Sequence, residues 1–206
     1  MFRDRRDAGQ ELARKMRDYR GKNGIVLALP RGGVPVGYEL AKELAMPLAA
    51  LVVRKVGHPD NPEYALCATD SSGESLCGTA AAEVEAPWLA AAIAKEAAEA
   101  ARRERLYRGA NPAPFLAGKV VIIADDGVAT GLTMRFAIMR VRAQGPAHIV
   151  VAVPVIPADF AGMLEEEGVV VAAVERPEHF LGAVGAYYEQ FDQVSDEEVR
   201  AAMASL

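Results

Sequence analysis

The sequence predicts an α/β protein with three layers, in which a mainly parallel central sheet lies between two layers of helices. Short, continuously apolar runs alternate with stretches of helical spacing along most of the chain, and glycine-bearing turns separate them. Of the 206 residues, 51% are hydrophobic, which is enough to fill one complete core. We therefore expect a single domain over residues 1–206.

The first quarter of the chain contains two predicted strand–helix joints. Asp7 is expected to cap a helix with apolar positions up to Tyr19. The order that follows is a strand at 25–29, the turn Pro-Arg-Gly-Gly at 30–33, a helix at 34–45 and a strand at 48–53 that ends at Arg54 and Lys55.

The middle of the chain is less regular and is predicted to be an insertion into the core. A turn-rich loop at 56–62 is a candidate lid, and two strands at 63–69 and 74–78 flank a turn to form a hairpin. Cys67 and Cys77 fall in this hairpin, and we expect both to be reduced. A long helix at 86–108 follows, with a proline in its first turn.

The alternation of strand and helix then resumes. Strands are predicted at 119–124, 147–153 and 169–174, with helices at 132–144 and 158–167 between them, and a last helix begins after Ser195. These elements divide the domain into a core at about 20–55 and 115–175, an insertion at about 56–114 and a C-terminal hood at about 176–206.

Charge and hydropathy exclude several classes of protein. The 23 Lys and Arg residues against 28 Asp and Glu give a formal net charge of −5, which argues against a protein that coats nucleic acid. The arginine cluster at 102–108 alternates with glutamates and is read as a solvated helix face. The longest apolar stretch, 44–53, is about half of the ~20 residues that a membrane span needs. With no apolar signal core at the start, we expect a cytoplasmic protein without membrane contact.

One stretch carries most of the chemical information. Residues 119–134 read KVVIIADDGVATGLTM, in which an apolar strand leads into Asp125 and Asp126 and then a glycine-bearing loop opens a helix. Glycines let the backbone N–H groups of such a loop approach a phosphate closely, and the helix start favours an anion. Carboxylates beside the loop suit sugar hydroxyls or a magnesium shell. The pattern therefore indicates a sugar-phosphate site.

This stretch resembles the phosphoribosyl pyrophosphate (PRPP) signature of the type I phosphoribosyltransferases. The run ALPRGG at 28–33 is similar to the pyrophosphate loop of that family, and Arg54-Lys55 resembles its arginine–lysine pair. The three matches follow one another in family order, and the chain is most similar to the predicted bacterial phosphoribosyltransferases without an assigned base.

The resemblance implies a role for each matching residue. Asp125 and Asp126 would hold the ribose hydroxyls, and Arg54 and Lys55 would neutralise the leaving pyrophosphate. Mg²⁺ would be bound through PRPP, near the two aspartates. The 5′-phosphate loop would comprise Gly127, Val128, Ala129, Thr130, Gly131, Leu132 and Thr133, and the pyrophosphate loop would comprise Arg31, Gly32 and Gly33, which in the family often includes a cis peptide bond.

Two positions depart from the family pattern. Ala129 stands where purine-salvage members carry an aspartate that serves as the proposed general base, and alanine cannot accept a proton. Gly127 replaces the usual aliphatic residue, which we expect to loosen the loop. In the hood, Phe180, Tyr187 and Tyr188 are candidates to stack on the base, with packing of the last helix on the sheet as the alternative.

The function that the resemblance implies is transfer of the phosphoribosyl group of PRPP to a nitrogenous base or related nucleophile, within nucleotide salvage. The base is unidentified, and a homodimer is the usual state in the family. The alternative is a non-catalytic regulator that senses PRPP or a nucleotide on the same fold.

Overall fold

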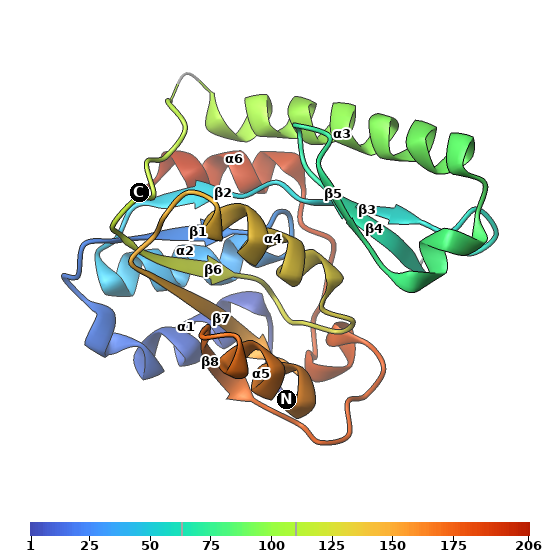
Figure 1. Ribbon diagram of the computed structural model, residues 1–206. Coiled ribbons are helices and arrows are strands. Elements are labelled where there is room, and N and C mark those ends of the chain that lie inside the picture. The colour runs from blue at the N-terminus through green and yellow to red at the C-terminus, as the bar shows by residue number, and fades with distance from the viewer. Residues whose placement is uncertain (63, 110) are drawn as a thin grey trace.

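The central sheet of the computed structural model, which describes residues 1–62, 64–109 and 111–206, has five parallel strands. Their order is β2-β1-β6-β7-β8, as Figure 1 shows. The strands are β1 (Gly24–Ala28), β2 (Leu48–Ala50), β6 (Val120–Ala124), β7 (His148–Val155) and β8 (Val170–Glu175). All their pairings are parallel, so the predicted sheet is confirmed.

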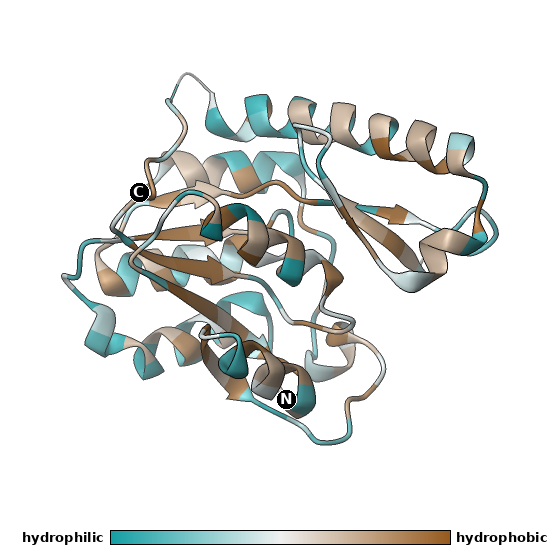
Figure 2. Cartoon of the chain, viewed as in Figure 1, coloured by the Kyte–Doolittle hydropathy of each residue, from teal (hydrophilic) through white to brown (hydrophobic). Residues whose placement is uncertain are grey.

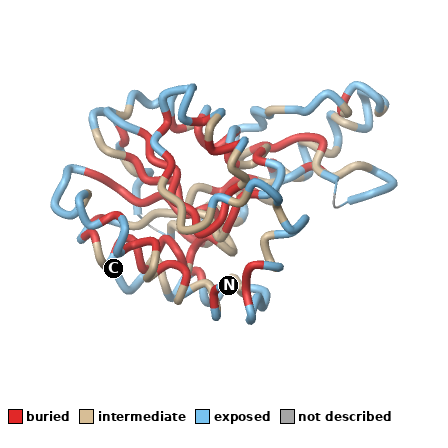
Figure 3. Tube along the Cα trace, turned by 90° about the horizontal axis from the view of Figure 1, so that it is seen from below, coloured by how far each residue is buried: buried red, intermediate tan, exposed pale blue. Residues whose placement is uncertain are grey.

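Helices cover both faces of this sheet and complete the three predicted layers. The register aligns Val26, Ile122 and Val150 on one face, where they pack against α1 (Arg5–Lys15) and α2 (Gly33–Leu44). The next residue of each strand points to the opposite face, where α4 (Leu132–Arg142) and α5 (Ala158–Glu166) pack. Burial on both faces explains the continuously apolar strands, which appear brown in Figure 2 and lie in the buried part of the molecule in Figure 3.

A second, antiparallel sheet lies beside the core. It consists of β3 (Arg54–Gly57), β4 (Ala65–Thr69) and β5 (Ser75–Cys77), and the long helix α3 (Ala86–Arg108) packs against it (Figure 1). The last helix, α6 (Asp196–Ala204), contacts α2, α3 and β2. Within the described ranges, three short 3₁₀ segments at Arg17–Tyr19, Thr79–Glu83 and Val184–Tyr187 complete the elements.

Two local predictions are wrong, and a third can be checked only in part. The second core strand ends at Ala50, and Arg54 and Lys55 begin a strand of the antiparallel sheet instead of ending a core strand. The first helix is capped by Asp4, whose side chain accepts from the Asp7 N–H, so that Asp7 lies in the first turn. The predicted hairpin is present, although its first predicted residue, Glu63, lies outside the described residues.

The cysteines are joined in the structure, which corrects the expectation that both are reduced. The register of β4 and β5 places Cys67 directly opposite Cys77, with a Cα–Cα distance of 4.0 Å, and the two form a disulfide. Cys67 is fully buried whereas Cys77 is exposed. The bond therefore ties the edge strand β5 to the middle strand of the small sheet.

Candidate functional site

The two sequence motifs emerge side by side at the carboxyl edge of the central sheet. Ala28, the last residue of β1, pairs with Ala124, the last residue of β6. The loop with Arg31 therefore leaves the sheet next to the loop with the two aspartates. This edge is where open parallel sheets bind their ligands.

Two glycines allow these loops to touch. A Cβ on Gly32 would lie 2.1 Å from Asp126 Oδ2, and a Cβ on Gly33 would lie 2.7 Å from the Ala124 carbonyl oxygen. Only glycine fits at either position without moving the acidic loop. The peptide bond between Pro30 and Arg31 is cis, as the resemblance implies for this loop.

The adjacent carboxylates have perturbed ionisation. Burial, followed by the charge of Asp126, raises the pKa of Asp125 well above its usual value. Burial likewise raises the pKa of Asp126, and the nearby charges of Arg5 and Lys55 oppose this shift. Two neighbouring acids that resist ionisation are suited to a ligand that brings its own hydrogen-bond donors or cations.

The loop after the aspartates has two features that would suit an anion. Gly131, at the start of α4, has a φ of +78°, which side chains rarely adopt. A Cβ there would also lie 2.3 Å from the Phe160 ring, so both the backbone conformation and the packing require glycine. Among the described residues, Thr133 Oγ1 is a buried side-chain atom without a hydrogen-bond partner. A buried hydroxyl normally has a partner, and a bound phosphate oxygen would supply one. The Val128 N–H, in contrast, already donates to the Val155 carbonyl at 2.9 Å and does not face this space.

Gly127 is tightly packed, which contradicts the expectation that it loosens the loop. It is buried, and a Cβ would lie 2.6 Å from Val184 Cγ1 of the hood and 2.9 Å from Val155 Cγ1 of β7. An aliphatic residue would therefore clash with the hood. The glycine lets the hood lie directly on the phosphate loop.

The three predicted cationic residues have different surroundings. The charge of Lys55 opposes the rise in the pKa of both aspartates, so this side chain is close enough to act on them electrostatically. Arg54, its neighbour on β3, forms an ion pair of 2.7 Å with Glu96 on α3, on the opposite face of the strand. Arg31 Nη1 lies 3.8 Å from an Asp196 carboxylate oxygen at the start of α6. The structure therefore associates Lys55 with the acidic pair and holds Arg54 against α3.

The hood aromatics are packed into the structure. Tyr187 and Tyr188 are both buried, at 5% and 6% exposure, and Phe180 packs on Tyr187 with ring centroids 5.3 Å apart. The Tyr188 hydroxyl donates to the Asp126 backbone carbonyl at 2.6 Å. Tyr187 and Tyr188 pack with Phe2, Ala8 and Val155, so they do not hold the last helix on the sheet as the packing alternative expected. The stacking role stays a prediction, which Phe180 fits better because it is less buried.

The N-terminal segment contributes to the site in a way that sequence reasoning did not predict. The Phe2 N–H donates to the Tyr187 carbonyl, and the Glu189 N–H donates to the Phe2 carbonyl, both at 2.8 Å. Arg5 Nε donates to Asp126 Oδ2 at 2.7 Å. No periodicity or motif points to this arrangement, because its partners lie more than a hundred residues away.

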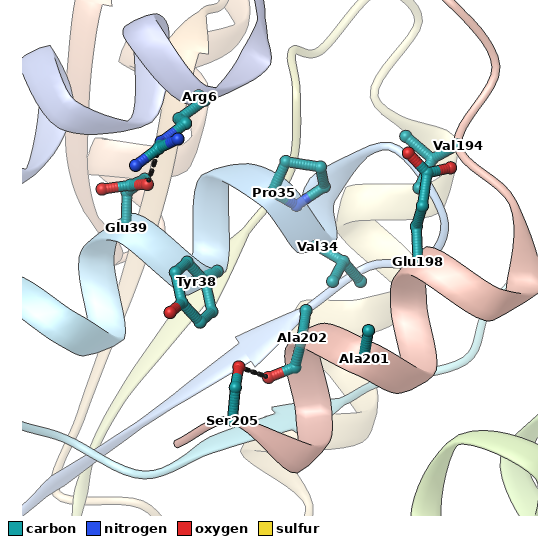
Figure 4. A pocket seen from close by; sticks show the side chains of 10 residues that line it. All are labelled: Arg6, Val34, Pro35, Tyr38, Glu39, Val194, Glu198, Ala201, Ala202 and Ser205. Carbon is teal, nitrogen blue, oxygen red and sulfur yellow. Dashed lines mark hydrogen bonds and ion pairs between the residues drawn. The ribbon is translucent and has the colours of Figure 1, made fainter.

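A separate groove of about 490 Å³ lies between α2 and α6 (Figure 4). It is open to solvent, and the Arg6–Glu39 ion pair of 3.0 Å is at one end of it. None of the predicted site residues lines this groove, so we place the functional site at the strand ends instead. The groove is lined by Arg6, Val34, Pro35, Tyr38, Glu39, Val194, Glu198, Ala201, Ala202 and Ser205.

The carboxylates of the site could hold a divalent ion only together with a bound ligand. Within the part of the chain that the structure describes, no group of three or more His, Cys, Asp or Glu side chains is placed to hold a metal. Asp125 and Asp126 offer two carboxylates, and Mg²⁺ is commonly held by one or two carboxylates together with substrate phosphates and water. The residues therefore fit Mg²⁺ that arrives with a phosphorylated ligand.

The fold is that of an α/β protein whose candidate site lies at the carboxyl edge of its parallel sheet. The family model described as "Phosphoribosyl transferase domain" matches residues 4–189. The chain belongs to this family, and the resemblance drawn from its motifs is confirmed.

Relatives and a solved structure agree with this assignment. A protein named "Putative phosphoribosyl transferase", from two strains of Mycobacterium tuberculosis, is 42% identical over 209 residues, which cover 98% of this chain. The match covers 46% of that protein, so the chain spans about half the length of these relatives. The crystal structure of TT1426 from Thermus thermophilus is 40% identical with a TM-score of 0.79, over 98% of this chain and 97% of that one. No helix among the described residues is long and apolar enough to cross a bilayer.

Proposed function

We propose that the protein transfers the 5-phosphoribosyl group of PRPP to a nitrogen nucleophile and releases pyrophosphate, with Mg²⁺ as cofactor. The observation that carries the proposal is the register of β1 and β6. It brings the Arg31–Gly33 loop into contact with the Asp125–Asp126 pair at one edge of the sheet.

Each part of the site has a role in this reaction. Asp125 and Asp126 accept hydrogen bonds from the ribose hydroxyls, and the loop at 127–133 binds the 5′-phosphate, with Thr133 as a hydroxyl donor. The loop at 31–33 binds the pyrophosphate, and Lys55 approaches it from β3. When bound, Mg²⁺ supplies neutralising charge to the departing pyrophosphate.

The transition state explains why these residue types are suitable. Departure of pyrophosphate from C1′ places positive charge on the ribose and negative charge on the leaving group. Fixed N–H groups and cations stabilise the leaving group, and the carboxylates oppose the positive charge on the sugar. Water must be excluded because hydrolysis of PRPP competes, and the loop at 56–62 is the candidate lid.

The acceptor is a nitrogenous base or a related amine. Ala129 is exposed and carries no proton acceptor, so the nucleophile must lose its proton to another group or to water. Phe180 is the hood residue that we propose to contact the acceptor, in a cytoplasmic enzyme of nucleotide salvage that forms a homodimer.

A panel assay tests the proposal. We expect pyrophosphate to be released when the protein is incubated with PRPP, Mg²⁺ and one member of a panel of purine bases, pyrimidine bases and small amines. Asp126→Asn is the matched control and should lose turnover. If no acceptor leads to pyrophosphate release, the proposed transferase activity is refuted.

The regulator remains the second candidate, and calorimetry separates it from the enzyme. Binding of PRPP or a nucleoside monophosphate without turnover would favour a sensor. The structure offers little positive surface for nucleic acid on α3, because Arg102 and Arg103 pair with Glu99 at 2.7 Å and Arg108 pairs with Glu104.

A further inference from the structure

Arg5 links the N-terminal segment to Asp126 and to the hood through one guanidinium group. Its Nε donates to Asp126 Oδ2 at 2.7 Å, and its Nη1 donates to the Asp192 carbonyl oxygen of the hood at 2.6 Å. The guanidinium carbon also lies 3.7 Å from the centroid of the Phe191 ring. The side chain is only 12% exposed, and that of Asp126 is 15% exposed, so the pair is shielded from bulk water.

The Asp126 carboxylate depends on this contact for its orientation. Its Oδ2 lies against Gly32 of the pyrophosphate loop and accepts a hydrogen bond from Arg5. The backbone of Asp126 is held separately, by the Tyr188 hydroxyl on its carbonyl and by Asp125 Oδ1 on its N–H. Removing Arg5 would leave the peptide in place and release the side chain, which would then turn away from Asp125 to find water.

We propose that Arg5 is a positioning residue for PRPP, which holds Asp126 Oδ2 so that the other carboxylate oxygen is presented to a ribose hydroxyl. The inference rests on the proposed function, because it assigns the ribose to Asp126. Arg5 acts through Asp126 and through the hood, and it does not contact the pyrophosphate loop directly in any hydrogen bond of the described residues.

The geometry requires arginine at this position and not only a positive charge. The two bonds of Arg5 leave from different nitrogens of one rigid plane, which also lies over an aromatic ring. Lysine has one nitrogen and can contact the carboxylate or the carbonyl, but it cannot bridge them in the same way. Arg5→Lys should therefore restore part of the effect and Arg5→Met none of it.

Binding of two ligands to the same protein distinguishes positioning from general damage. Isothermal titration in the presence of Mg²⁺ measures the affinities of wild type, Arg5→Met and Arg5→Lys for PRPP and for inorganic pyrophosphate, which lacks the ribose. We expect Arg5→Met to lower the affinity for PRPP by about 10- to 100-fold, as loss of a hydrogen bond to a charged group does. Its affinity for pyrophosphate should stay within about twofold of the wild-type value. Arg5→Lys should lie between Arg5→Met and wild type.

Arg3→Met is the matched control. Arg3 lies on the same segment, but its side chain is 63% exposed and pairs only with Asp4 and Asp7 in the described residues. This variant should bind both ligands as wild type does. If Arg5→Met does not fold, the proposal is tested by comparing Arg5→Lys with wild type. Arg5→Lys should then bind PRPP about threefold or more weakly.

The outcomes are distinct. Unchanged PRPP affinity in Arg5→Met, or an equal loss for PRPP and pyrophosphate, overturns the positioning role and leaves the proposed function standing. A wild-type protein that binds neither PRPP nor pyrophosphate overturns the proposed function and this inference with it.

Discussion

The two aspartates illustrate how a functional residue opposes stability. Burial raises the pKa of Asp125, so at intermediate pH the folded ligand-free protein binds more protons than the unfolded chain. Its stability must then fall as the pH rises through the folded-state pKa. Under the proposed function, the same desolvated carboxylates accept hydrogen bonds from the ribose.

The Asp125→Asn variant tests this conflict directly. We expect it to be more stable than wild type at pH 7, on the order of 1–3 kcal/mol, because a neutral amide replaces a buried acid and its oxygen can still accept the Asp126 N–H. Urea denaturation at pH 7 and pH 4.5 measures the difference, which should shrink at the lower pH. Turnover should be lost. A variant that is less stable than wild type at both values would contradict the interpretation.

Gly127 gives a second prediction about a single residue. An added methyl group in Gly127→Ala would meet Val184 and Val155, so the variant should lose about 1–3 kcal/mol of unfolding free energy. Gly162→Ala is the control, because Gly162 lies within α5 with open space around it and alanine should stabilise that helix by roughly 0.4–1 kcal/mol. Equal effects of the two substitutions in thermal denaturation would refute the packing argument.

The small antiparallel sheet shows how one element depends on a covalent bond. In the part of the chain that the structure describes, three residue pairs join β5 to β4, and the Cys67–Cys77 bond is at one of them. Arg140 on α4 also holds the connecting turn through an ion pair of 2.6 Å with Asp70. The edge strand is therefore fixed by a disulfide and by a helix that starts at the phosphate loop.

A serine at the exposed cysteine measures the contribution of the bond. Under oxidising conditions we expect Cys77→Ser to lower the unfolding free energy by up to about 3 kcal/mol, from the loop-closure entropy that the disulfide removes from the unfolded chain. With excess reductant in both samples, the difference from wild type should largely vanish. If the unfolding free energies of the variant and wild type still differ when both are reduced, the effect comes from side-chain packing and not from the disulfide.

The start of α6 contacts both α3 and the loop that contains Arg31. Asp196 accepts from the Tyr107 hydroxyl at 2.6 Å and from Arg102 at 3.4 Å, and it lies 3.8 Å from Arg31 of the pyrophosphate loop. The hydrogen bond from Tyr107 is the main cause that lowers the pKa of Asp196. Burial, followed by this hydrogen bond, raises the pKa of Tyr107 to about 12.

This network predicts a pH dependence. Because the folded-state pKa of Asp196 lies below the unfolded value, its ionised form contributes stability that is fully present above about pH 4 and is lost as the pH falls through the folded-state pKa. Asp196→Asn should be less stable than wild type at pH 7, and the two should converge on acidification below pH 4. Chemical denaturation across this pH range measures the unfolding free energies of both proteins. A difference between them that does not change with pH would exclude an electrostatic cause.

At the scale of the whole molecule, the sheet is the part that the sequence predicts well. The three central strands β1, β6 and β7 are short runs of apolar residues that are buried on both faces, so the local pattern is sufficient to predict them. The phosphate loop is likewise contiguous, and its register beside the Arg31 loop follows from parallel pairing. Ends and connections were predicted less well, as with the cap at Asp4, because several nearby residues satisfy the same local rule.

The rest of the site could not be predicted because its contacts are non-local. The disulfide depends on the register of two short strands, which the turn-rich sequence around them does not specify. Arg5 is one of several charged residues at the start of the chain, and nothing nearby distinguishes it from Arg3 or Arg6. The tight packing of Gly127 depends on Val184, which belongs to the irregular hood.

The bonds of Arg5 also set an order of events during synthesis. Its two partners, Asp126 and Asp192, follow it by 121 and 187 residues. A growing chain can pair its first strands and helices early, but the Arg5–Asp192 bond cannot form until the chain has been made at least as far as Asp192 and has left the ribosome. The acidic pair is therefore translated long before its hood is available, and completion of the site is a late step of folding.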